Sequence, residues 1–222
     1  MVFDFDGVIV DSEPVHWRAF REVLAPLGIP LSWEDYTDRY MGFDDRDAFR
    51  EAFRSRGREL PADRLAELIS AKSRAFHAIL SEGIRPLPGA VPLVRSIRSR
   101  GIPLAVCSGA LRTDIDPILA SLRLSDCFDR IVSAEEVERS KPDPASYRLA
   151  WSALKERFPE RITVPERSLA VEDTPAGIAS AKGAGLSVLA VAGSHPREEL
   201  EGADVVAGSL EEVSISPGRT PP

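Results

Sequence analysis

Two carboxylates one residue apart, Asp4 and Asp6, follow a short apolar run and precede Gly7. Alternate residues of a strand point to the same face, so we expect both acids on one side of a strand end. Gly7 allows a turn there, because glycine adopts a positive φ without a steric penalty. Two like charges this close repel by roughly 4 kcal/mol at an intermediate effective dielectric constant. The pair therefore predicts a cation or a catalytic use at this position.

Two other interpretations of these acids remain open. They could cap the strand with polar groups, or they could belong to a calcium loop, because Asp4, Asp6, Gly7 and Glu13 match positions of an EF-hand loop. The calcium loop also needs a ligand at Val2 and a helix before it, which the sequence does not offer. We therefore favour the catalytic interpretation over calcium.

The spacing of apolar residues predicts the elements that position these acids. Helical spacing begins at Val15 and ends before Gly28 and Pro30, and further helices are predicted at Trp33–Tyr40, Arg46–Arg56 and Ala62–Leu80. Beyond residue 89, helices are predicted at Ala90–Arg100, Thr113–Leu122, Pro144–Phe158 and Pro175–Ala184, and strands at Pro103–Cys107, Arg130–Ser133, Ser168–Val171, Ser187–Val191 and Asp204–Val206. Alternating strands and helices predict an α/β fold with a doubly wound parallel sheet, a Rossmann-like core.

An all-helical block placed directly after the first strand indicates an inserted cap domain. We predict a catalytic core from residues 1–12 and 84–213, a helical cap from residues 13–83, and hinges at Glu13-Pro14 and Gly83–Pro88. The last residues, 214–222, are rich in Pro, Ser and Gly, and we expect them to form a disordered tail.

Polar residues follow the first four predicted strands of the core at their carboxyl ends, where ligands bind in open parallel sheets. Ser108 and Gly109 follow one strand, Lys141 lies beyond another, and Glu172 and Asp173 follow a third. Taken singly, a serine or aspartate here is most often a helix N-cap, and a lysine is most often a surface charge. The joint pattern predicts one site.

The composition limits the classes of partner. The chain has 222 residues, 43% hydrophobic residues and a net charge of -7, without a long basic run, so we do not expect nucleic acid as a partner. No stretch approaches the ~20 apolar residues of a membrane span, so we expect no membrane partner either. Cys107 and Cys127 have no metal-type spacing and fit a reducing cytoplasm, where we expect the protein as a monomer or weak dimer.

Four motifs at these strand ends resemble those of the haloacid dehalogenase superfamily, in its phosphatase and phosphomutase branch. They are Asp4-Phe5-Asp6-Gly7-Val8, Val106-Cys107-Ser108-Gly109, Lys141-Pro142-Asp143-Pro144 and Val171-Glu172-Asp173-Thr174. The resemblance covers residues 1 to about 213. A helical insert directly after the first motif is similar to the cap of the β-phosphoglucomutase-like subgroup.

The resemblance implies roles for the catalytic residues. Asp4 is implied as the nucleophile that becomes an aspartyl phosphate, and Asp6 as the general acid and base. Ser108, with the backbone N–H of Gly109 beside it, is implied to hold phosphoryl oxygens. Lys141 is implied to neutralise the charge on the nucleophile and the phosphoryl group.

The resemblance also implies Mg²⁺ as the cofactor, held by Asp4, Asp173 and the backbone carbonyl of Asp6. Glu172 is implied to orient a water on the metal or to bind it weakly. Mg²⁺ is also expected on physical grounds, because a carboxylate that attacks a phosphate dianion needs a hard cation to reduce the charge repulsion, and oxygen ligands suit Mg²⁺. The carboxylate at Asp6 favours phosphate esters over carbon–halogen or carbon–phosphorus bonds.

Several residues are candidates for substrate binding. Lys72 falls on the apolar stripe of the helix at 62–80, so it either snorkels to water or faces a cleft, and the resemblance favours the cleft. His16 matches a histidine of the subgroup, although a histidine at a helix start can simply pack or cap. The subgroup's phosphate-gripping arginine is replaced here by Asp45, with Arg46 one place later, while Arg112 could compensate for Ala110, which replaces a polar phosphate contact.

The resulting interpretation is a phosphatase that hydrolyses a small phosphorylated metabolite, such as a sugar phosphate. A β-phosphoglucomutase-like phosphomutase is the alternative enzyme, weakened by Asp45, because a mutase must hold a second phosphate in its cap. A binding or regulatory protein without turnover is the alternative from another class, and the intact motif acids argue against it.

Overall fold

The computed structural model describes residues 1–41 and 43–215. Within it the chain divides into two compact units, one formed by Met1–Val10 with the chain from Pro86 onward, and the other by Asp11–Arg85. Most of the predicted tail, residues 216–222, lies outside the described residues, as does Gly42.

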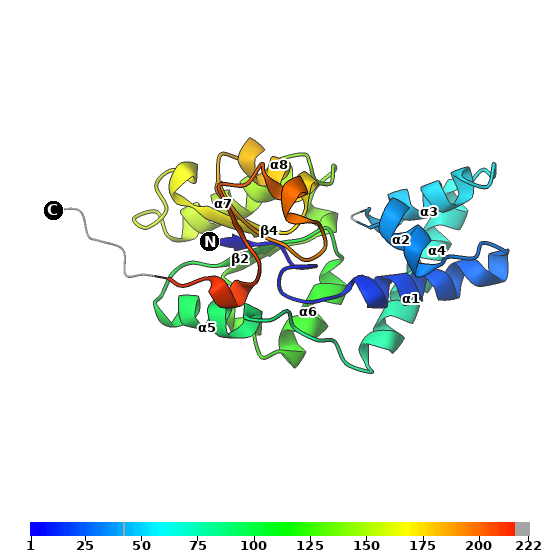
Figure 1. Ribbon diagram of the computed structural model, residues 1–222, viewed down its shortest axis with the longest axis horizontal. Coiled ribbons are helices and arrows are strands. Elements are labelled where there is room, and N and C mark those ends of the chain that lie inside the picture. Colours follow the sequence, from blue (N-terminus) through cyan, green and yellow to red (C-terminus); the bar gives the residue numbers. More distant parts are fainter. Residues whose placement is uncertain (42, 216–222) are drawn as a thin grey trace. The chain divides into compact units, whose positions relative to one another are not determined.

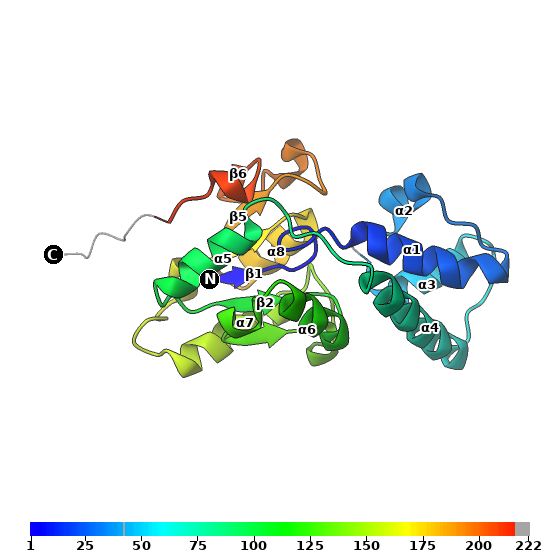
Figure 2. The same cartoon turned by 90° about the horizontal axis from the view of Figure 1, so that it is seen from below.

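The first unit is built on a six-stranded sheet in which every pair of neighbouring strands is parallel (Figure 2). The strand order is β3-β2-β1-β4-β5-β6. The strands are β1 (Val2–Phe3), β2 (Ala105–Cys107), β3 (Arg130–Val132), β4 (Leu169–Glu172), β5 (Ser187–Val191) and β6 (Val205–Ala207). The α/β fold with a parallel sheet is therefore confirmed.

Helices cover both faces of this sheet, with α7 and α8 on one side and α5 and α6 on the other (Figure 1). They are α5 (Ala90–Ser99), α6 (Arg112–Ser121), α7 (Ala145–Arg157) and α8 (Pro175–Gly183). Because both faces are covered, alternate strand residues enter two cores, and the strands read as continuous apolar runs. Val2 and Ala105, which are register partners, join the core beneath α7 and α8. Their neighbours Phe3 and Val106 also pair and are fully buried.

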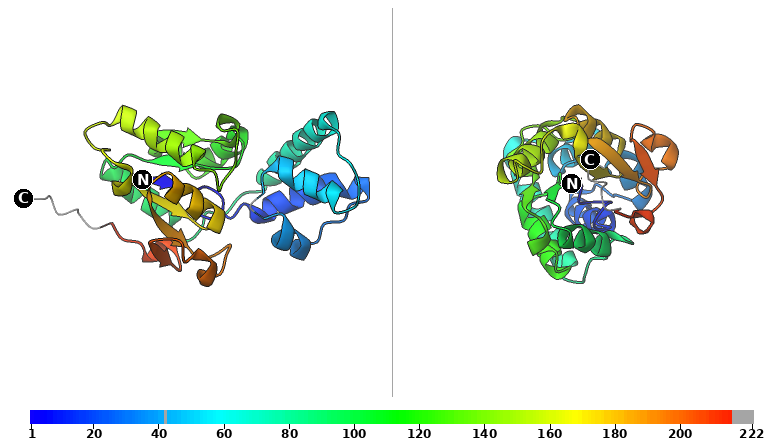
Figure 3. Two further views of the ribbon diagram at one scale, coloured as in Figure 1. Left: turned by 90° about the horizontal axis from the view of Figure 1, so that it is seen from above. Right: turned by 90° about the vertical axis from the view of Figure 1, so that its left-hand side faces the viewer.

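The second unit is entirely helical in its described residues, as the blue to cyan segments of Figure 3 show. It contains α1 (Glu13–Leu24), α2 (Trp33–Arg39), α3 (Asp45–Arg54) and α4 (Ala62–Leu80). Its own hydrophobic core includes Phe20 of α1, Tyr36 of α2, Phe49 of α3 and Leu68 of α4. Every helix in the described part of the chain is too short or too polar to span a bilayer.

The segments that join the units are paired with each other. The backbone N–H of Leu87 donates to the carbonyl of Ile9 (3.0 Å), and that of Asp11 donates to the carbonyl of Arg85 (3.2 Å). The two passages of the chain therefore run side by side at the point where the predicted hinges begin.

The first strand is short. It ends at Phe3, and Asp6 then forms an isolated bridge with Val10, while Gly7 has a φ of 77°. The turn thus starts directly after Asp4, so the two acids are not carried by one regular strand. This early turn separates the surroundings of the two carboxylates.

Candidate active site

The candidate site lies where the strand order reverses, because β2 and β4 pair with opposite edges of β1. Crevices at such a switch point, beyond the carboxyl ends of the strands, are where open parallel sheets bind ligands. Asp4 follows β1, and its backbone N–H donates to the carbonyl of Val171 in β4 (2.9 Å). Asp173 follows β4, so the fold brings these two distant acids together.

Lys141 lies at the centre of the charged groups. Its ammonium Nζ donates to Asp4 Oδ1 (2.6 Å), to Glu172 Oε1 (2.5 Å) and to the carbonyl of Cys107 (3.1 Å). Its three N–H groups therefore all have an acceptor. The side chains of Lys141, Asp4 and Glu172 are 16%, 10% and 0% exposed, so solvent screens these ion pairs only weakly.

Glu172 accepts hydrogen bonds at both carboxylate oxygens. Its Oε1 accepts from Lys141 and from the hydroxyl of Tyr147 (2.7 Å), and its Oε2 accepts from the backbone N–H of Asp173 (3.2 Å) and the hydroxyl of Thr174 (3.3 Å). A carboxylate has about four lone-pair positions. All four are used within the protein, so Glu172 has little capacity left to bind a metal directly.

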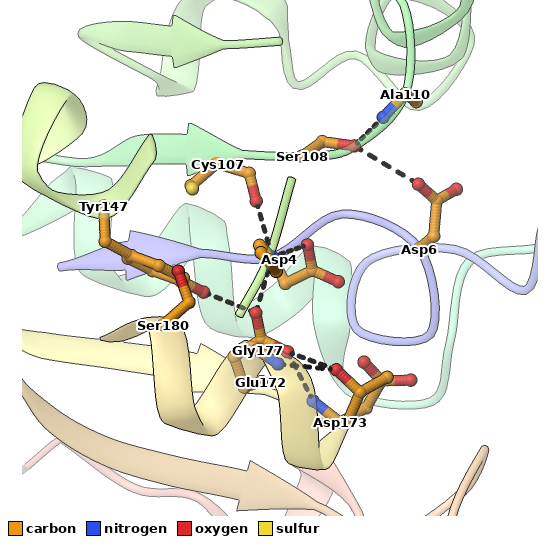
Figure 4. A network of polar contacts seen from close by, with 12 residues as sticks. Asp4, Asp6, Cys107, Ser108, Ala110, Tyr147, Glu172, Asp173, Gly177 and Ser180 are labelled. Atoms are coloured by element: carbon orange, nitrogen blue, oxygen red, sulfur yellow. Dashed lines mark hydrogen bonds and ion pairs between the residues drawn. The ribbon is translucent and has the colours of Figure 1, made fainter. Parts of the chain in front are cut away.

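Asp6 has different surroundings from Asp4 (Figure 4). The hydroxyl of Ser108 donates to Asp6 Oδ2 (3.2 Å) and accepts from the backbone N–H of Ala110 (2.9 Å). Ser108 is thus held by the loop after β2 and oriented toward the second acid. The structure brings Ser108 and Asp6 together but keeps the carboxylate of Asp6 apart from the ion pairs of Lys141.

The acids at the switch point have the donor chemistry of a metal site. Asp4, Glu172 and Asp173 are buried, and each offers an oxygen within 4.8 Å of the others. Gly7 packs so closely that a Cβ there would lie 1.8 Å from Asp173 Oδ2, which explains why this turn needs glycine. An all-oxygen set with one nearby ammonium fits a hard divalent cation.

Burial and charge shift several pKa values in the site. Burial raises the pKa of Asp4 well above its usual range, although Lys141 opposes this shift. The pKa of Lys141 is raised despite its burial, because Asp4 and Glu172 surround the ammonium. Burial raises the pKa of Cys107 to about 12, and it also raises the pKa of Tyr147. At neutral pH both of these groups therefore keep their protons.

In the helical unit, Lys72 and His16 contact each other. The Lys72 ammonium is 2.8 Å from His16 Nδ1 and donates to Asp45 Oδ1 (2.7 Å), and it lies over the rings of Phe20 and Phe76. The side chain is only 1% exposed, so Lys72 does not snorkel to water. Its role in substrate binding stays a prediction.

The remaining candidates for substrate binding are more exposed. Arg46 is paired with the carboxylate of Asp44, and Arg112 at the start of α6 is paired with Asp116. Gly109 lies beside Ser108 in the loop after β2 and has open space around its Cα. Each of them stays a prediction.

Sequence reasoning missed two residues that contact the charged cluster. Tyr147 lies on α7, six residues after Lys141, and Ser194 follows β5, where its hydroxyl donates to Asp173 Oδ2. A buried tyrosine on an apolar helix face is a usable signal, because its hydroxyl needs a partner. Nothing in the sequence around Ser194 indicates its contact.

Comparison with known proteins identifies the family. A family model described as haloacid dehalogenase-like hydrolase matches residues 1–191. The match spans most of the chain and includes every motif described above, so the chain belongs to the haloacid dehalogenase-like hydrolase family.

Three relatives and one solved structure illustrate the range within the family. The protein CbbY of Cereibacter sphaeroides is 30% identical over 96% of this chain and 93% of its own length. A crystal structure of a CbbY variant from Rhodobacter sphaeroides, in complex with xylulose-(1,5)bisphosphate, superposes with a TM-score of 0.84 at 29% identity, covering 95% of this chain and 94% of that one.

A phosphorylated carbohydrates phosphatase of Thermotoga maritima is 29% identical over 84% of this chain and 81% of its own length. A β-phosphoglucomutase of Bacillus subtilis is 26% identical over 97% and 91%. The predicted relationship to β-phosphoglucomutase-like proteins is confirmed, and the named phosphatase supports the prediction of a phosphomonoester hydrolase.

Proposed function

We propose that the protein is a Mg²⁺-dependent phosphatase that hydrolyses a small sugar phosphate through an aspartyl phosphate on Asp4. The observation that carries this proposal is the contact of Asp4 with Lys141 inside a buried group of carboxylates. An ammonium bound to one oxygen of Asp4 leaves the other oxygen available as a nucleophile. The relative named as a phosphorylated carbohydrates phosphatase supports the substrate class.

The reaction has two steps. In the first, a carboxylate oxygen of Asp4 attacks phosphorus, the bond to the ester oxygen breaks, and Asp6 donates its proton to the leaving alkoxide. In the second, Asp6 takes a proton from a water whose oxygen attacks phosphorus, and the acyl–phosphate bond breaks to return Asp4 and free phosphate. Ser108 orients Asp6 through its hydroxyl. The reaction needs opposite protonation states in the two acids, and each acid has its own hydrogen-bond partner, Lys141 for Asp4 and Ser108 for Asp6.

The donor set fits the metal that this family implies. Asp4 and Asp173 would hold a divalent cation together with the backbone carbonyl of Asp6. Glu172 would hold Lys141 in place through their ion pair. The bound cation would neutralise the repulsion between the nucleophile and the phosphate. It would also oppose the burial that raises the pKa of Asp4, and thereby keep this carboxylate ionised.

A phosphomutase is the second candidate, favoured by the relationship to a β-phosphoglucomutase. A mutase must bind a second phosphate with cations of its cap. In the helical unit the buried ammonium of Lys72 is already neutralised by Asp45, which makes it a poorer phosphate ligand. This ion pair favours the phosphatase.

The test is a phosphate-release screen over sugar monophosphates and bisphosphates, with Mg²⁺ or with a chelator. We expect Mg²⁺-dependent release that Asp4→Asn abolishes, while Asp126→Asn, which changes an exposed acid, keeps full activity. Incubation with a hexose 1-phosphate and a bisphosphate primer distinguishes the two candidate functions. Isomerisation without net phosphate release would identify a mutase and exclude the phosphatase. Full activity of Asp4→Asn would refute both.

The remaining parts of the proposal concern the setting of the enzyme. We propose a cytoplasmic enzyme that acts as a monomer or weak dimer on a small metabolite. Both cysteines are free thiols, as a reducing compartment leaves them. Sedimentation of the purified protein would measure the oligomeric state directly.

A further inference from the structure

Tyr147 is a buried aromatic residue behind the catalytic lysine, and the reaction proposed above does not use it. It lies in the first turn of α7 and is fully buried. Its hydroxyl donates to Glu172 Oε1 (2.7 Å), and its ring lies beneath the Lys141 ammonium, whose Nζ is 5.0 Å from the ring centroid. Figure 4 shows the phenol pointing directly at Glu172. One side chain thus contacts both partners of the Lys141–Glu172 ion pair.

The contacts of Lys141 and Glu172 form a closed network. Lys141 uses its three N–H groups on Asp4, Glu172 and a backbone carbonyl, and Glu172 uses its two oxygens on four donors. In such a network each hydrogen bond restricts the position of its neighbours. Among the described residues, removing the donor at Tyr147 leaves Lys141 as the only donor to Glu172 Oε1, so Glu172 and the ammonium are free to shift together, away from Asp4.

We propose that Tyr147 is a positioning residue for the nucleophile, which it serves by holding Glu172 so that Lys141 stays on Oδ1 of Asp4. This inference rests on the proposed function, because it takes Asp4 as the nucleophile. Tyr147 does not touch the substrate. Its loss therefore acts on the chemical step, with little effect on the binding of the sugar phosphate.

The test is Tyr147→Phe in the full chain, which keeps the ring under Lys141 and removes only the hydroxyl. With a sugar phosphate that the wild-type protein hydrolyses, we expect kcat to fall by roughly tenfold or more at an unchanged KM, since small misplacements of reacting groups have effects of this size. Trp151→Phe is the matched control, because it removes a hydrogen bond to Ser168 one turn further along α7. We expect the control to keep the wild-type kcat.

A double-mutant cycle separates positioning from a general loss of stability. If Tyr147 acts through Glu172, then Tyr147→Phe adds no further loss of kcat once Glu172→Gln is present. The proposal would be overturned if the kcat losses of Tyr147→Phe and Glu172→Gln multiplied as independent effects, or if Tyr147→Phe kept the wild-type kcat. Either result would leave the proposed phosphatase function unaffected. Absence of phosphate release by the wild-type protein itself would overturn the proposed function, and this inference with it.

Discussion

Replacement of Lys141 by methionine tests the charged cluster most directly. Methionine keeps most of the length of the side chain and removes the charge. Each of the ion pairs, at 2.6 Å to Asp4 and 2.5 Å to Glu172, corresponds to an attraction of about 6–7 kcal/mol at an effective dielectric constant of 20. The loss of hydration on burial opposes this attraction, so the net effect is smaller. Removing one partner of a buried pair destabilises a protein by about 3–5 kcal/mol.

The loss in stability should depend on pH. Lys141 holds down the pKa of Asp4, which burial raises, so this pKa rises further in Lys141→Met. The folded variant then binds a proton that the unfolded chain has released. Its stability therefore falls as the pH rises, by up to about 1.4 kcal/mol per pH unit for each such proton. We expect the deficit relative to the wild type to be larger at pH 8 than at pH 5.

Urea unfolding of the metal-free protein, followed by circular dichroism at pH 5 and pH 8, measures this difference. Lys182→Met is the matched control, because the ion pair of Lys182 with Asp204 is exposed, at 37% and 48%, and should contribute at most about 1 kcal/mol. If Lys141→Met were as stable as Lys182→Met at pH 8, the reasoning about a buried charge network would be refuted.

Two further predictions concern packing around the site. If Mg²⁺ binds as proposed, it should raise the melting temperature of the wild type. Gly7→Ala should abolish this rise, because its Cβ would lie 1.8 Å from Asp173 Oδ2. Gly28→Ala, at a similar φ of 71° but in open space, should keep the rise, and thermal shifts with and without Mg²⁺ compare the two variants. An aromatic disulfide reagent should titrate Cys127 in the native protein and Cys107 only after unfolding. The reason is that burial raises the pKa of Cys107 to about 12, which keeps the thiol protonated and unreactive. Rapid reaction of two thiols in the native state would contradict this prediction.

The sequence predicted the helices and strands more completely than the contacts between their side chains. The alternation of apolar runs predicted the parallel sheet and its helices, because each element buries a face with its own period. The helix Ala62–Leu80 and the strand Ser187–Val191 have the predicted bounds. Asp4 and Asp6 are not alternate residues of one strand as expected, since the turn at Gly7 starts directly after Asp4 and ends the pairing of β1 with β2 and β4.

The grouping of Asp4, Lys141 and Asp173 follows from the sequence as well. Each comes after a predicted strand, and the carboxyl ends of parallel strands share one edge, so residue type and spacing were sufficient to predict a common site. The family resemblance of the motifs pointed to the same residues. In this sense the sequence by itself determined the class of fold and the place of the candidate site.

The contacts within the site depended on the tertiary structure. Tyr147 reaches Glu172 from α7, Ser194 reaches Asp173 from the loop after β5, and Asp45 of α3 neutralises Lys72 of α4. These contacts join residues far apart in the chain, and they depend on helix rotation and side-chain direction, which apolar periodicity leaves open. Only the packed structure decides which donor meets which acceptor, because a hydrogen bond needs its two atoms within about 3 Å.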